Sequence, residues 1–192
     1  MLIAAYIVLA LSFGIGNMLM YYRCVSAAPI RLNHGLGASL ITTVIQTALF
    51  MAGMTIGDLV RFELTDIPNA MSKTNAMVMF GMVLIVALRQ LAPYLRRNRE
   101  QAVFDLRSWK TTLAMSIATG VNLFLTGIGV GFVASPSTDI HKALWPMVII
   151  LLLLSYWGVM LGRQKVKIRP RRWALLEALL IIGVGVAALI NS

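Results

Sequence analysis

Neutral polar side chains interrupt several long apolar stretches of this sequence. The stretch IATGVNLFLTGIGVG, residues 117–131, carries Thr119 and Asn122, while Asn17 and Gln46 lie in two earlier apolar stretches. A side-chain amide has two N–H donors and one oxygen acceptor, which all need partners inside a membrane. Such an amide either links neighbouring helices, at about 0.6 kcal/mol on average, or offers its oxygen to a hydrated cation or polar solute.

The second interpretation defines a candidate substrate site. Amides in three different apolar stretches are as consistent with one shared interior site as with separate contacts between helices. A shared site would use the oxygen atoms of these amides and of hydroxyls near them. The candidate substrate-binding residues are therefore Asn17, Gln46, Thr119, Asn122 and Ser155.

Acidic residues are absent from the centres of the apolar stretches. Asp58 follows the second stretch, and Glu177 lies about one turn inside the last one, close to Arg171 and Arg172. A charge at the bilayer centre costs about 2.5–3.5 kcal/mol, so the sequence favours a Glu177 that reaches the cytoplasmic interface as an anchor. In the alternative interpretation, Glu177 and Asp58 handle protons or ions and are the candidate coupling residues.

Other kinds of site find little support in the sequence. The single cysteine, Cys24, excludes an intramolecular disulfide, and the twelve methionines are interpreted as packing residues rather than a soft-metal path. No nucleophile–base pair, phosphate-binding loop or HExxH motif is present. We therefore expect neither an enzyme nor a cofactor, and the sequence assigns no metal ligands.

The composition is that of an all-α membrane protein. The chain is 59% hydrophobic and only 12% charged, and its mean hydropathy is +0.82, whereas soluble domains are about 25% charged. A membrane span needs about 20 apolar residues. Six stretches are predicted to span, forming a single membrane domain: Leu2–Tyr22, Leu36–Gly57, Asn75–Leu95, Thr111–Ala134, Ala143–Leu161 and Trp173–Ile190.

The basic residues predict the orientation. Of the 17 Lys and Arg residues, two lie in the first connection, six in the third and six in the fifth. Because basic loops stay in the cytoplasm, this distribution places these three loops there and both termini on the outer side of the membrane. The membrane is expected to be the cell (inner) membrane. Because this charge lies between apolar stretches rather than on one amphipathic face, the net charge of +10 does not indicate nucleic-acid binding. Aromatic residues at the predicted span ends are expected in the headgroup layer: Tyr21, Tyr22, Tyr94, Trp109, Trp145 and Trp173.

Two halves of the chain resemble each other. Gly53 and Gly57 end the second stretch with the same spacing as Gly158 and Gly162 at the end of the fifth, and LALSFGIGN in the first loosely matches LAMSIATGVN in the fourth. Each repeat would hold three helices, the first over residues of about 1–95 and the second over about 111–192, with a basic loop of about 96–110 between them. Because three is an odd number of membrane crossings, the two repeats would lie in opposite orientations. Inverted repeats are typical of secondary transporters. The alternative is that such glycine pairs only allow close helix packing.

The sequence resembles the manganese efflux pumps of the lysine-exporter superfamily. The resemblance rests on the runs Ile117–Asn122 and Gly127–Gly131, on Gln46 followed by the Gly53–Gly57 spacing, on the Gly162-Arg163 pair and on the Gly183-Val184-Gly185 run. It implies a secondary exporter of a divalent cation, with membrane lipid and a small substrate as its partners and a homo-oligomer as a possible assembly.

The resemblance also implies a pair of intramembrane aspartates as the metal-binding groups. These correspond here to Gly14 and Asn122, and the family's acid at the start of the last span corresponds to Ala174. Mn²⁺ favours oxygen ligands, carboxylates above all, so their loss weakens attraction for a divalent ion. Three hypotheses follow: an exporter of a divalent cation through a neutral polar site, an exporter of a small organic solute such as an amino acid, or a degenerate membrane protein that does not transport.

Overall fold

Six helices make up the described part of the chain. The computed structural model describes residues 3–61, 68–95, 103–134 and 136–190. The helices are α1 (Ile3–Ala27), α2 (Leu32–Val60), α3 (Pro68–Leu95), α4 (Trp109–Gly131), α5 (Pro136–Arg163) and α6 (Pro170–Ile190). Each contains a segment that is long and apolar enough to cross a membrane, which confirms the prediction of an all-α chain with six such helices.

Most of the helices are longer than the apolar stretches that predicted them. Helix α1 continues to Ala27 rather than ending at Tyr22, and α2 begins at Leu32 rather than Leu36. Apolarity marks the part of a helix that suits the hydrocarbon layer, whereas backbone hydrogen bonding continues into the polar turns beyond it. Helices α3, α5 and α6 each begin at a proline, a residue suited to the first helical position. Residues 96–102 of the predicted basic loop lie outside the described residues.

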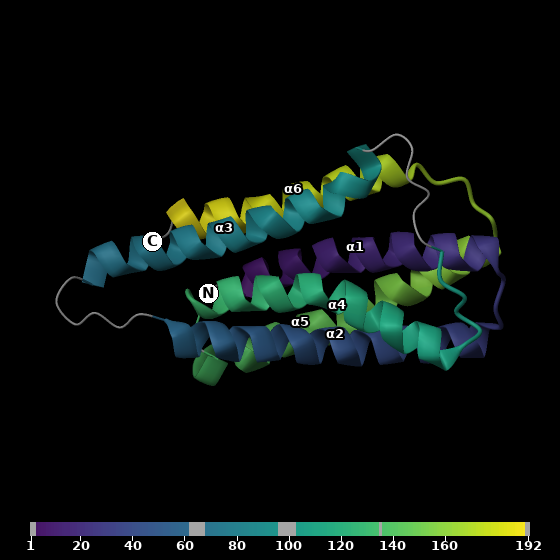
Figure 1. Cartoon of the computed structure of the whole chain (residues 1–192), viewed down its shortest axis with the longest axis horizontal. Helices are drawn as coiled ribbons and strands as arrows, with labels where there is room; N and C mark the ends of the chain where they lie inside the picture. Colours follow the sequence, from purple (N-terminus) through teal and green to yellow (C-terminus); the bar gives the residue numbers. More distant parts are fainter. Residues whose placement is uncertain (1–2, 62–67, 96–102, 135, 191–192) are drawn as a thin grey trace.

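The helices pack in two layers, as Figure 1 shows. Helices α3 and α6 lie side by side in one layer, and α1, α2, α4 and α5 form the other. Within the larger layer α2 packs on α4, α1 packs on α5, and α2 also contacts α5, while the contacts of α1 with α6 and of α3 with α4 join the layers. Both termini lie at one end of the bundle, called the terminal end below, and α2, α4 and α6 begin at the other, the loop end.

Glycines bring the backbones of α2 and α4 into contact. A Cβ placed on Gly57 would meet the Ile128 carbonyl oxygen and would lie 3.0 Å from the Gly131 Cα atom. Gly53 and Gly127 make similar backbone contacts one turn earlier. In the α1–α5 pair, a Cβ on Gly158 would lie 2.8 Å from the Met18 Cα atom. The α2–α4 and α1–α5 pairs are therefore each held at a distance that only glycine allows.

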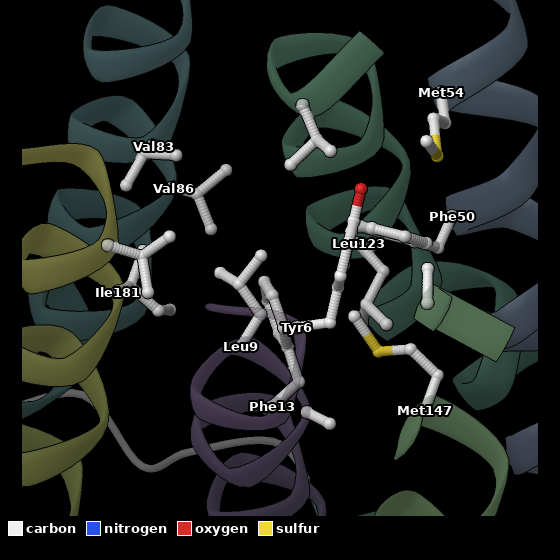
Figure 2. Packing of buried hydrophobic residues seen from close by; sticks show 14 of the residues in the cluster. Tyr6, Leu9, Phe13, Phe50, Met54, Val83, Val86, Leu123, Met147 and Ile181 are labelled. Atoms are coloured by element: carbon white, nitrogen blue, oxygen red, sulfur yellow. The ribbon is translucent and has the colours of Figure 1, made fainter. Parts of the chain in front are cut away.

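Two apolar clusters fill the bundle on either side of its middle. The cluster toward the terminal end, shown in Figure 2, joins side chains from α1, α2, α3, α4, α5 and α6, among them Tyr6, Leu9, Phe13, Phe50, Met54, Val83, Val86, Leu123, Met147 and Ile181. The cluster at the loop end joins Tyr21, Cys24, Val25, Ile30, Ala38, Leu106, Met115 and Val159. Several polar side chains of α1, α2 and α4 lie between the two.

Candidate substrate site between α1, α2 and α4

Three of the predicted site residues come together at mid-length of their helices. Asn17 lies in the middle of α1, Gln46 in the middle of α2 and Thr119 in the middle of α4. The side chains of Asn17 and Gln46 are 4% and 0% exposed. Gly120 of α4 faces the same part of α2, because a Cβ there would meet the Leu49 Cδ1 atom and would lie 3.7 Å from the Gln46 Cγ atom. The structure therefore brings these three residues together, which both the shared-site and the interhelical-contact interpretations allow.

Hydrogen bonds connect the three side chains directly. Asn17 Nδ2 donates to Gln46 Oε1 over 2.6 Å, and Gln46 Nε2 donates back to Asn17 Oδ1 over 3.0 Å. Gln46 Nε2 also donates to Thr119 Oγ1 over 2.8 Å, while the Thr119 hydroxyl donates to the Met115 carbonyl oxygen of its own helix. The two amides thus form a reciprocal pair between α1 and α2, extended to α4 by the second N–H of Gln46.

Counting donors and acceptors shows what remains for a ligand. Both N–H groups of Gln46 are used, whereas Asn17 keeps one N–H that no described residue accepts. Each amide oxygen accepts one hydrogen bond here and has two lone pairs, so Asn17 Oδ1 and Gln46 Oε1 each retain one. The group, which we call the amide triad (Asn17, Gln46 and Thr119), therefore keeps unused lone pairs on two carbonyl oxygens and on one hydroxyl oxygen.

A second hydrogen-bonded chain runs from the amide triad toward the loop end. Tyr21, Thr42 and Ser116 are joined by distances of 2.6 and 2.7 Å, and Ser116 Oγ donates to the Thr112 carbonyl oxygen. Because each hydroxyl has one hydrogen, Thr42 must donate to Ser116 and Tyr21 must donate to Thr42. Tyr21, expected to meet the headgroup layer, is fully buried in the protein, where Thr42 provides a partner for its hydroxyl.

Asn122 and Ser155 lie near this region without joining the triad. Asn122 follows Thr119 by three residues on α4, and its Oδ1 atom is buried with no hydrogen-bond partner among the described residues. Ser155 of α5 is fully buried, and its Oγ atom also has no partner there. Most buried polar atoms in proteins are hydrogen-bonded, so these two oxygens keep an unused capacity to accept hydrogen bonds in this conformation.

Comparison with known protein families identifies the family to which the chain belongs. A family model described as a putative manganese efflux pump matches residues 29–189. The chain belongs to this manganese efflux family. The match confirms the resemblance stated from the sequence, and the family is one of membrane transporters. Neither the curated proteins nor the solved structures contain a match to this chain.

The two acids predicted for coupling have very different surroundings in this member of the manganese efflux family. Asp58 lies twelve residues beyond Gln46, about 18 Å along α2, and is half-buried at the terminal end. Glu177 is 4% exposed and its carboxyl packs against Gly16, at mid-length of α1. A Glu177 side chain that reaches the interface, as favoured from the sequence, is therefore not what the structure has.

The described residues contain no group of three or more His, Cys, Asp or Glu side chains that could hold a metal ion. The candidate site predicted from the sequence did not include Tyr21, Thr42 or Ser116. Spacing could have found them, because Tyr21 lies one turn from Asn17, Thr42 one turn from Gln46 and Ser116 one turn from Thr119.

Proposed function

We propose that this protein is a secondary transporter that exports a divalent cation, Mn²⁺ in the first instance, through the amide triad. The observation that carries the proposal is the meeting of Asn17, Gln46 and Thr119 from three helices at mid-length of the bundle. Midplane polar sites where helices meet are where secondary transporters bind their substrates. Membership of the manganese efflux family supports the choice of cation.

The binding mode we infer uses oxygen atoms without formal charge. Mn²⁺ accepts carbonyl, hydroxyl and water oxygens as well as carboxylates. The free lone pairs on Asn17 Oδ1 and Gln46 Oε1, together with the unpartnered Asn122 Oδ1 atom, suit a cation that keeps part of its hydration shell. Binding through such oxygens is weak, which favours release on the far side of the membrane.

The packing supports an inverted repeat. Gly53 and Gly158 lie 105 residues apart, and so do Gly57 and Gly162, and Asn17 and Asn122. With this offset, α2 packing on α4 corresponds to α5 packing on α1, and α1 packing on α6 corresponds to α4 packing on α3. The register pairs Asn122 with Asn17 rather than with Gly14, so we propose that both positions equivalent to the family's paired acids now carry amides.

Transport through this site requires access from each end in turn. The apolar cluster toward the terminal end contains Phe13, Phe50 and Leu123, and Leu106 belongs to the cluster that covers the loop end. In the present conformation both clusters lie between the amide triad and the ends of the bundle. We propose that rocking of one repeat against the other opens them alternately, with the loop end in the cytoplasm and both termini outside, as the Lys and Arg distribution favours.

A second candidate function is export of a small organic solute such as an amino acid. The observation that favours it is the free N–H of Asn17 beside the two free carbonyl lone pairs, since a neutral site with both donors and acceptors suits a zwitterion. The two functions require different substrates but the same triad residues.

Purified protein reconstituted into vesicles separates the candidates. We expect saturable uptake of radioactive Mn²⁺ that falls at least tenfold in Gln46→Leu, because the substitution removes the central oxygen of the triad. Uptake of labelled amino acids without Mn²⁺ uptake would favour the second candidate. Absence of flux for Mn²⁺ and amino acids alike, or a Gln46→Leu protein as active as the wild type, contradicts the proposed site.

A further inference from the structure

Glu177 is the one acidic side chain buried within the described part of the bundle. A Cβ placed on Gly16 would have three atoms of this carboxyl group as its nearest neighbours, Cδ at 3.0 Å and Oε2 at 3.2 Å with Oε1 nearer still. One turn earlier on α1, the Ser12 hydroxyl donates to the Glu177 carbonyl oxygen over 2.8 Å. Helix α6 is therefore attached to α1 at Ser12, and the absence of a side chain at Gly16 makes the space in which the carboxyl lies.

The surroundings of the carboxyl suit a proton better than a metal ion. Ile15, Leu19 and Ala174 form an apolar cluster beside it, and within the described ranges no side chain donates a hydrogen bond to it. A metal ion needs several oxygen ligands, whereas a single carboxyl group can bind and release one proton unaided. Protonation also removes a charge that is costly in a membrane interior.

Charged groups on the neighbouring helices stand away from the carboxyl. Arg23 of α1 is half-buried and lies seven residues beyond Gly16, about 10 Å along the helix, so its charge still acts on Glu177. Arg89 of α3 and the two arginines at the start of α6, Arg171 and Arg172, are exposed. Arg23 is therefore the cation whose charge acts on the Glu177 carboxyl.

The same turn of α1 connects this carboxyl to the amide triad. Gly16 faces Glu177, and the next residue, Asn17, forms the reciprocal amide pair with Gln46. A charge that appears or disappears beside Gly16 changes how closely α6 can pack on α1. Any resulting shift of α1 also moves Asn17 relative to Gln46, so the two sites share a rigid element.

We propose that Glu177 is the proton-carrying group of the transporter and that it exchanges one proton for each exported cation. The carboxylate takes up a proton from one side of the membrane and, as the carboxylic acid, releases it to the other, while the cation moves in the opposite direction through the triad. No bond forms between Glu177 and the cation. The inference rests on the proposed function, since it assigns the ion that drives the same transport.

The test uses the full chain in vesicles that contain a pH-sensitive dye. Addition of Mn²⁺ to wild-type vesicles should move protons in the direction opposite to Mn²⁺, and an imposed pH gradient should accelerate Mn²⁺ flux several-fold. In Glu177→Gln we expect the proton movement and the acceleration to fall to the level of empty vesicles. Exchange of Mn²⁺ against radioactive Mn²⁺ should persist, because it needs the triad but no net proton transfer.

Two further variants make the result specific. Asp58→Asn removes the other candidate coupling acid, which is half-buried about 18 Å from Gln46, and should leave proton movement unchanged. Gly16→Ala keeps the carboxyl but places a methyl group against it, and should reduce proton coupling more than Mn²⁺ exchange. Wild-type Mn²⁺ flux without proton movement, or proton coupling that survives in Glu177→Gln, overturns this inference and leaves the proposed function intact. Absence of any Mn²⁺ flux overturns the proposed function itself.

Discussion

Replacement of Gln46 by leucine tests the amide triad most directly. The side chain makes three hydrogen bonds, one accepted from Asn17 and two donated to Asn17 and Thr119. Hydrogen bonds between membrane helices contribute about 0.6 kcal/mol each on average, so their loss should destabilise the fold by about 2 kcal/mol. Leucine has nearly the same volume, which keeps a packing defect from adding much to this figure.

A change of about 2 kcal/mol lowers the Tm of a chain of this size by roughly 4–8 °C. Thermal unfolding in detergent, followed by circular dichroism, measures the shift. Thr43→Val is the matched control, because Thr43 is fully buried on the same helix and its Oγ1 atom has no partner among the described residues. Removal of an unpaired hydroxyl should change stability by less than about 0.5 kcal/mol and leave Mn²⁺ flux unchanged.

A double-mutant cycle decides whether the amides form a pair. Asn17→Leu alone leaves two hydrogen-bonding positions of Gln46 without a partner, so the single variants should together cost more than the double variant. The coupling energy should be about 1 kcal/mol, from two bonds at about 0.6 kcal/mol each. Additive effects of the two substitutions would refute the pairing, and an equal Tm loss in the Thr43→Val control would refute the attribution to hydrogen bonds.

Three further predictions address the charge, the packing and the closure of the bundle. Asn122→Asp adds the acid that the family resemblance implies at this position and should lower the KM for Mn²⁺ at least tenfold in vesicle uptake, whereas a rise in KM would contradict the site. Gly57→Val should prevent close packing of α2 on α4 and greatly reduce the yield of folded protein on size-exclusion chromatography, while Gly81→Val, at a position with no atom within 4 Å of an added Cβ, should behave like the wild type. Leu106→Ala should weaken the loop-end cluster and raise downhill Mn²⁺ flux about two-fold or more, and an unchanged rate would show that this cluster is not a barrier.

The chemical type of the polar side chains predicted the residues of the amide triad better than hydropathy predicted where the helices begin and end. Asn17 and Gln46 were identifiable because an amide in an apolar stretch needs partners that its own helix cannot provide, and each supplies them to the other. Ser155 followed from the same reasoning but lies on α5 with no hydrogen-bond partner among the described residues. Hydropathy reports the composition of a stretch and not the direction in which each residue points.

Glu177 and Tyr21 show what composition alone could not reveal. Both lie near apparent ends of apolar stretches, where a polar group normally reaches the headgroup layer. The structure places them inside because of residues on other helices: Gly16 of α1 makes room for the Glu177 carboxyl, and Thr42 of α2 provides a partner for the Tyr21 hydroxyl. Their depth therefore depends on helix pairing and rotation, which a single sequence does not contain.

The separation of charge from the substrate site has a consequence for transport. In a site built from paired carboxylates, protons and cations compete for the same oxygen atoms. Here the amide oxygens of Asn17 and Gln46 do not titrate near neutral pH, and the titratable carboxyl lies on a different face of α1, against Gly16. Competition must then act through the position of α1 rather than through shared ligands. Exchange of one proton for one divalent cation would also move one net positive charge outward, so an inside-negative membrane potential should oppose export by about 2.3 kcal/mol per 100 mV.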